Sequence, residues 1–142
     1  MYELEELRKR IEEGDYITAL QIVDELDEMS KEDKLNKIYS YMVILLIHLI
    51  KQSAEQRTTS SWDRSILNST DNINRTNKRR KSGGYYANGD ALREIINEAY
   101  PRAIKEASFE AFEGKLSWQE LNEKVDRNSI KEKAISLLEF AD

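Results

Sequence analysis

The segment Tyr41-Met42-Val43-Ile44-Leu45-Leu46-Ile47-His48-Leu49-Ile50-Lys51-Gln52 is the most apolar run of the chain and decides its fold. The run from residue 41 to residue 50 is about half as long as the roughly 20 residues that cross a bilayer. It therefore predicts a buried helix of a folded core and no membrane span. The only histidine of the chain, His48, interrupts this run, so a ring that titrates near neutral pH lies where burial is expected.

The composition predicts an all-α fold. A chain of 142 residues with 39% hydrophobic residues has the size of one domain,. One proline and five glycines are too few for the frequent turns of an all-β chain,. We therefore expect residues 1–142 to form a single-domain helical bundle of about five to seven helices. The absence of cysteine excludes disulfides, zinc–thiolate sites and thiol nucleophiles within one chain,.

Apolar periodicity and capping signals predict the elements. Gly14 is placed to end a first helix, and Asp15 to cap a second,. Ser30 with Asp33 resembles a capping box that opens a long third helix to about residue 56, the expected centre of the core,. The polar residues 58–61 offer N-caps for a fourth helix,.

The second half of the chain has its own punctuation. Residues 81–89 read as a flexible loop, followed by a fifth helix capped by Asp90 and reaching Phe112,. Pro101 should kink or split that helix,. A capping box at residues 117–120 predicts a short sixth helix, and the apolar residues 130–141 predict a terminal one,.

Charge is segregated along the chain. Residues 1–33 carry twelve acids and four bases, a net charge of −8, whereas residues 57–81 carry seven bases and two acids, a net of +5. The overall charge of −5 thus hides one basic segment.

This basic segment predicts a nucleic-acid interface. Cations beside aromatic rings in a loop suit phosphate contact together with base stacking. The residues we expect to bind nucleic acid are Arg64, Arg75, Lys78, Arg79, Arg80, Lys81 and Tyr85. The alternative is a solvated helix end whose cations pair with the acidic helices of the same or another subunit.

A second candidate site surrounds the histidine. His48, Lys51 and Gln52 share one helix face, and Arg57 follows shortly after,. As a catalytic site of a nuclease or phosphodiesterase, His48 would transfer a proton while Lys51, Arg57 and Arg64 hold phosphate. The alternative is that a neighbouring helix satisfies a buried histidine. One histidine excludes a two-histidine ribonuclease mechanism within one subunit.

No metal site is predicted. The sequence lacks the histidine and cysteine spacings of metallohydrolases,. Magnesium held by carboxylates alone is the one cofactor left open. The acidic start has no secretory signal, which predicts a cytoplasmic location,.

The segment 45–52, followed by Arg57, Ser60, Trp62 and Ile66, resembles the small helical proteins grouped as domain of unknown function 29, frequent in cyanobacteria. Two further segments, 24–26 and 98–103 with the later Ala107, agree in order with that family. The resemblance implies an all-α, cytoplasmic, bacterial and cyanobacterial protein whose common site would include His48, Lys51, Arg57 and Trp62. It implies no activity.

We therefore expect a helical protein that binds a polyanion such as nucleic acid. Its acidic N-terminal helices would be available for a protein partner or a homo-oligomer. A nuclease or phosphodiesterase is the first alternative, and a structural or oligomer-forming bundle is the second.

Overall fold

The computed structural model describes residues 2–81 and 83–141, and the part of the chain that it describes is helical with no strand beyond one isolated bridge. The elements, in order, are α1 (Tyr2–Glu12), α2 (Tyr16–Glu55), α3 (Ser60–Asn77), α4 (Gly89–Ser108), the 3₁₀ helix η1 (Ala111–Gly114), α5 (Trp118–Glu123) and α6 (Arg127–Ser136). The all-α prediction is confirmed. The chain divides into two compact units, residues 1–34 and residues 35–142. The expectation that the whole chain forms a single domain therefore stays a prediction.

The first unit contains α1 and the beginning of α2. Gly14 has a φ of 76°, the left-handed conformation predicted for it at the end of the first helix,. The side chain of Asp15 then accepts a hydrogen bond of 3.2 Å from the backbone N–H of Thr18, so Asp15 caps α2 as predicted,.

Helix α2 is one continuous helix, and the predicted break at Ser30 is wrong. Residues 16–55 contain no glycine or proline, so nothing ends the first predicted helix before the next begins,. Ser30 and Asp33 therefore lie inside the helix and cap nothing. The long helix predicted as the third is the second.

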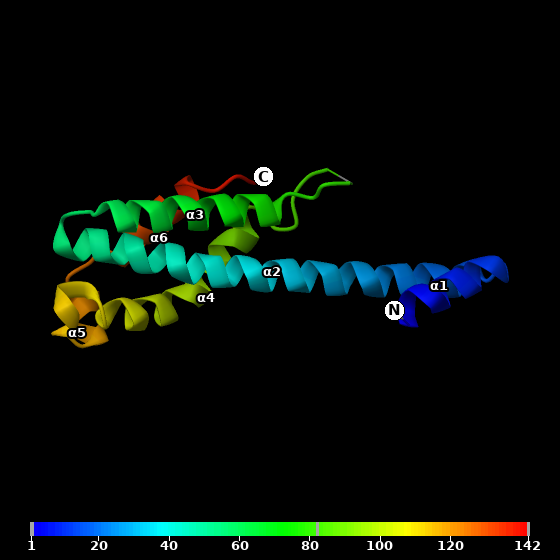
Figure 1. Cartoon of the computed structure of the whole chain (residues 1–142), viewed down its shortest axis with the longest axis horizontal. Coiled ribbons are helices and arrows are strands. Elements are labelled where there is room, and N and C mark those ends of the chain that lie inside the picture. Colours follow the sequence, from blue (N-terminus) through cyan, green and yellow to red (C-terminus); the bar gives the residue numbers. More distant parts are fainter. Residues whose placement is uncertain (1, 82, 142) are drawn as a thin grey trace. The chain divides into compact units, whose positions relative to one another are not determined.

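The core of the second unit is built around the apolar half of α2, next to which α3 runs (Figure 1). Each helix contributes its apolar stripe. The largest fully buried aliphatic side chains of this core are Ile38, Met42, Leu45, Leu46, Ile50, Ile73, Leu92, Ile96 and Leu121. The apolar segment of residues 41–52 thus lies at the centre of the core, as predicted.

Helix α4 differs from its prediction at its two ends. Its N-cap is Asn88, which accepts a hydrogen bond of 2.9 Å from the N–H of Ala91, and Asp90 lies inside the helix. The helix continues through Pro101 without a split, and the alternative of a kink there stays a prediction. It also ends at Ser108, before the predicted Phe112.

The last elements follow the capping signals. Ser117 and Glu120 form the predicted capping box, with both hydrogen bonds at 3.1 Å. Helix α6 begins after its N-cap Asp126 and ends at Ser136, short of the predicted end. Within the described residues, no helix is long and apolar enough to cross a membrane.

Candidate functional site

His48 lies half-buried on α2, inside the apolar run. Its Nδ1 atom is buried and has no hydrogen-bond partner among the described residues. Burial lowers the pKa of His48, and the positive charge of Lys51 lowers it further, while Glu110 opposes both effects,. The imidazole is therefore held in its neutral form near pH 7.

Lys51, one turn after His48, is almost fully buried, with 4% of its surface exposed. Its Nζ atom donates a hydrogen bond of 3.2 Å to Glu110 Oε1 and lies 4.7 Å from the centre of the Trp62 ring. A buried ammonium is costly unless it is paired. The carboxylate and the indole ring both compensate this charge.

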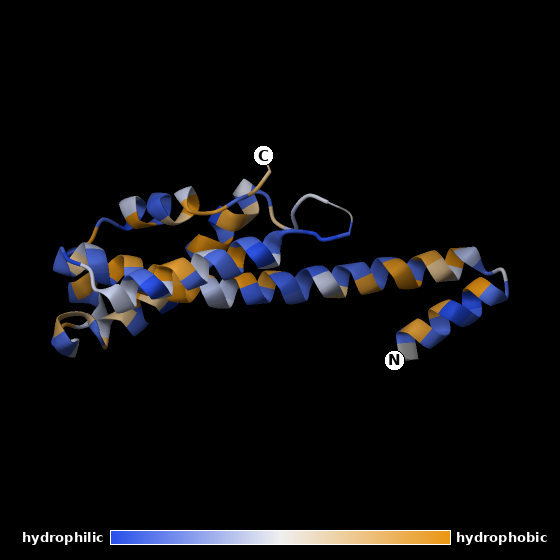
Figure 2. Ribbon diagram, turned by 45° about the horizontal axis from the view of Figure 1, so that its top comes forward, coloured by the Kyte–Doolittle hydropathy of each residue, from blue (hydrophilic) through white to orange (hydrophobic). Residues whose placement is uncertain are grey.

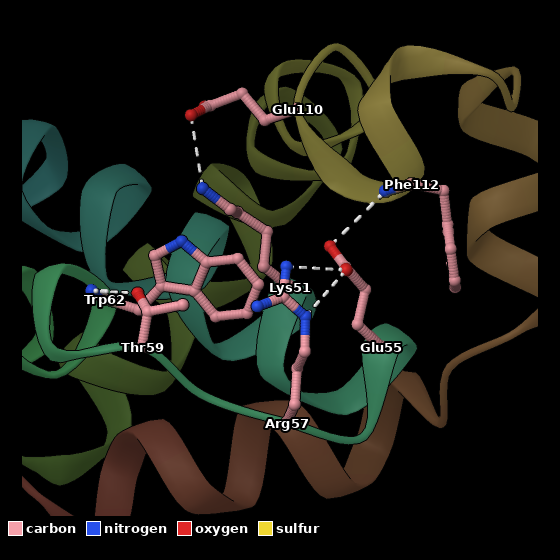
Figure 3. A network of polar contacts seen from close by, with 7 residues as sticks. All are labelled: Lys51, Glu55, Arg57, Thr59, Trp62, Glu110 and Phe112. Carbon is pink, nitrogen blue, oxygen red and sulfur yellow. Dashed lines mark hydrogen bonds and ion pairs between the residues drawn. The ribbon is translucent and has the colours of Figure 1, made fainter.

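Glu55, at the end of α2, joins three segments of the chain. Its Oε1 atom accepts a 3.1 Å hydrogen bond from Arg57 Nε, and its Oε2 atom accepts one of 3.3 Å from the backbone N–H of Phe112 (Figure 3). The guanidinium of Arg57 in turn lies 4.7 Å from the centre of the Trp62 ring. Trp62 is therefore contacted by two cations from the end of α2 and the loop after it.

The first turn of α3 fixes the indole. Thr59 is the N-cap of α3, and its hydroxyl accepts a 3.1 Å hydrogen bond from the backbone N–H of Trp62. The predicted caps at residues 58–61 are thus confirmed. The amide of Gln52 reaches the same corner, where it donates to Thr58 at 2.7 Å and to Asp63 at 3.2 Å.

A pocket of about 490 Å³ lies beside Trp62, and we call it the Trp62 pocket. Its lining contains as many cations as carboxylates. The lining residues are Lys51, Glu55, Arg57, Trp62, Glu110, Phe112, Glu113 and Lys115. Phe112 and Glu113 have φ values of 51° and 59°, and left-handed backbone at residues other than glycine often accompanies binding sites.

The structure brings together only part of the predicted catalytic set. Lys51 and Arg57 share the Trp62 pocket, whereas His48 and Arg64 are not among its lining residues. Sequence reasoning missed Glu110 and Phe112, which come from beyond α4. No local pattern could have placed them, because they lie 59 and 57 residues from their partners on α2.

All predicted nucleic-acid-binding residues except Arg64 lie near the C-terminal end of α3 or in the loop after it. We call residues 78–86 the basic loop; residue 82 lies outside the described residues. An isolated antiparallel bridge joins Lys78 and Tyr85. The N–H of Arg79 donates to Gly84 at 2.9 Å, so the loop folds back on itself as a short hairpin.

A buried amide closes the base of the basic loop. Asn77 is fully buried, and its side chain donates to the carbonyl of Ala87 at 3.0 Å and accepts from the Ala87 N–H at 2.7 Å. The N–H of Tyr86 also donates to the Asn77 carbonyl at 2.9 Å. These three bonds fix where the loop leaves and rejoins the core.

The cations differ in how they are engaged. Arg75 pairs with Asp71 at 3.0 Å, and the guanidinium of Arg79 lies 5.1 Å from the centre of the Tyr86 ring. The other three loop cations are exposed and form no ion pair with any described residue; they are Lys78, Arg80 and Lys81.

Arg64 and Tyr85 complete the predicted set. Arg64 is exposed and lies eleven residues before Arg75, on the same face of α3 and about 16 Å away along the helix axis,. Tyr85 is half-buried beside the cations. The predicted cations thus lie in two places, with Arg64 near the start of α3 and the others at its C-terminal end and in the basic loop.

The described residues contain no group of three or more His, Cys, Asp or Glu side chains able to hold a metal ion. The acidic residues of α1 and α2 are spread along their helices.

The chain was compared with known proteins. The family model described as Domain of unknown function DUF29 matches residues 3–134. No curated protein and no solved structure matches.

Proposed function

Since the chain belongs to the DUF29 family, whose description names no activity, we propose its function from the geometry: it binds nucleic acid through α3 and the basic loop. The observation that carries this proposal is the group of exposed cations Lys78, Arg80 and Lys81, which pair with none of the described carboxylates, on a loop whose base is fixed by Asn77. We place this activity in the cytoplasm of a bacterium such as a cyanobacterium.

The physical reason is the combination of charge and rings. Phosphates are bound by clustered lysine and arginine side chains, and the release of their counterions drives binding. Tyr85 and Tyr86 lie beside these cations, and aromatic rings next to cations suit the unstacked bases of single strands,. A loop that is fixed at its base loses less conformational entropy on binding than a free loop does.

We prefer single-stranded to double-stranded nucleic acid as the ligand. Most of the cations lie on a short hairpin. On the face of α3 that carries Arg64 and Arg75, the positions between them are occupied by Asn68 and Asp71. A helix that reads a major groove would present a more continuous basic face. The short hairpin instead provides charges and rings at one place, as single-strand binding requires.

A nuclease or phosphodiesterase in the Trp62 pocket is the second candidate. The observation that favours it is that Lys51 and Arg57 contact one indole ring beside two carboxylates. His48 does not line this pocket. Lys51 is therefore the first residue to test for this activity.

One experiment separates these proposals. Purified protein is incubated with labelled single- and double-stranded DNA and RNA, with and without magnesium, and mobility shift and cleavage are read in the same lanes. A salt-sensitive shift without cleavage supports the binding function. Cleavage that is lost in Lys51→Met supports the enzyme in the Trp62 pocket, and cleavage lost only in His48→Ala rejects that location. If the protein neither shifts nor cleaves any of these nucleic acids, both proposals are rejected and a structural bundle is favoured.

A further inference from the structure

The first compact unit, residues 1–34, leaves several of its large apolar side chains exposed. Several large apolar side chains on both helices are at least two-fifths exposed. They are Leu4, Ile11, Tyr16, Ile17, Leu20, Val23 and Met29. Figure 2 shows hydrophobic and hydrophilic residues alternating along both helices of this unit. Clustered apolar exposure of this kind marks interaction sites.

This surface is separate from the unit's own packing face. Ala19 is buried and Ile22 and Leu26 are half-buried, and these three recur at i, i+3 and i+7 on α2,. Tyr16, Leu20 and Val23 recur at i, i+4 and i+7 on a neighbouring stripe, and all three are exposed.

Acidic residues flank the exposed stripe of α2 on the side of Ile17. Asp24 and Glu28 follow Ile17 at i+7 and i+11, on the same side of the helix,. Unit 1 as a whole carries twelve acids and five bases, a net charge of −7. A second copy of the same unit would bring two strongly acidic surfaces together, which costs free energy. The charge therefore selects a basic occupant.

We propose that unit 1 is a docking surface for a basic amphipathic helix of a partner protein. The apolar side of that helix packs on Ile17, Leu20 and Val23. Its lysines or arginines face Asp24 and Glu28, which flank Ile17. In such a pairing of two helix faces, spaced apolar anchors supply affinity and flanking charges supply orientation.

The test uses a labelled synthetic peptide of leucine and lysine, with its leucines at helical spacing, and the full chain. We expect binding, read by fluorescence anisotropy, to weaken about tenfold or more in Ile17→Ser with Leu20→Ser, because two apolar contacts are lost. The control is Leu67→Ser with Phe109→Ser in unit 2, since those side chains are 68% and 76% exposed, against 76% for Ile17 and 62% for Leu20. The control should bind as wild type does.

A second variant, Asp24→Asn with Glu28→Gln, keeps the apolar stripe and should also weaken binding. A peptide with glutamate in place of lysine should not bind. Equal binding by the apolar variant and its control would overturn the proposal, as would equal binding of the two peptides. Sedimentation of the free chain as a dimer that dissociates in Ile17→Ser with Leu20→Ser would overturn it in favour of a second copy.

Discussion

The side-chain amide of Asn77 forms two hydrogen bonds with the backbone of Ala87, one as donor at 3.0 Å and one as acceptor at 2.7 Å. Asn77 is fully buried and Ala87 is nearly so. The Asn77 side chain therefore supplies hydrogen-bond partners for the backbone N–H and carbonyl of Ala87, the first residue after the basic loop. The position of the loop depends on this one side chain.

Replacement of Asn77 should destabilise the second unit. Asn77→Ala leaves the buried N–H and carbonyl of Ala87 without partners, and we expect a loss of about 2–4 kcal/mol in the free energy of unfolding. Urea denaturation measures it. Asn68→Ala, at an exposed position of α3, is the control and should change stability by no more than about 0.5 kcal/mol. Equal stabilities would show that Asn77 does not hold the loop.

Lys51 should tolerate methionine better than alanine. Methionine fills the space against Trp62 without a buried charge, so we expect Lys51→Met to lie within about 1 kcal/mol of wild type. Lys51→Ala should lose about 2 kcal/mol or more because it leaves a cavity. Denaturant unfolding of both variants compares them. If methionine is as damaging as alanine, the ammonium and its bond to Glu110 hold the pocket together.

The neutral form of His48 should make stability depend on pH. Its folded pKa lies below the ordinary value of about 6.5 because of burial and Lys51,. The unfolded chain therefore takes up the proton first, so stability is full above about pH 6.5 and falls as pH drops below it. The nuclear magnetic resonance signal of the only imidazole reports the pKa directly. A value at or above 6.5 would contradict this, as would the same pH profile in His48→Gln.

Gly114, beside the Trp62 pocket, should resist substitution more strongly than Gly14. Both have φ values near 75°, where a side chain is strained,. A Cβ atom at Gly114 would lie 2.8 Å from the carbonyl oxygen of Phe109, whereas one at Gly14 meets nothing within 4 Å. Each alanine variant should lose about 1–2 kcal/mol from the backbone, and Gly114→Ala should lose more. Equal losses in thermal unfolding would mean that the 3₁₀ segment shifts to admit the methyl group.

The fold was largely predictable because its signals are local. Glycine at residue 14 and the capping box at Ser117 act within one turn, and the structure confirms both. The break at Ser30 failed for a reason of the same kind. A capping signal starts a helix only where the previous one ends, and no glycine or proline ends it here,.

The candidate site was predictable only on the α2 side. Lys51 and Arg57 are close in sequence, so helical spacing placed them near each other. Glu110 reaches Lys51 across 59 residues of chain, and its position depends on how α4 packs and where η1 turns. The hydrogen bonds between Asn77 and Ala87 were not predicted for a related reason. A polar residue in the last turn of an amphipathic helix is expected to be exposed.

The basic loop is tested most directly by the salt dependence of binding to a labelled single-stranded RNA. The loop variant is Lys78→Ala, Arg80→Ala and Lys81→Ala. The control, Lys37→Ala, Lys124→Ala and Lys133→Ala, removes the same charge from exposed lysines elsewhere. Fluorescence anisotropy is measured from about 50 to about 300 mM salt, where each phosphate contact adds about 0.7 to the slope. We predict that the slope falls by about 2 in the loop variant and stays at the wild-type value in the control. Equal slopes and affinities in the two variants would contradict the assignment of the basic loop as the nucleic-acid interface.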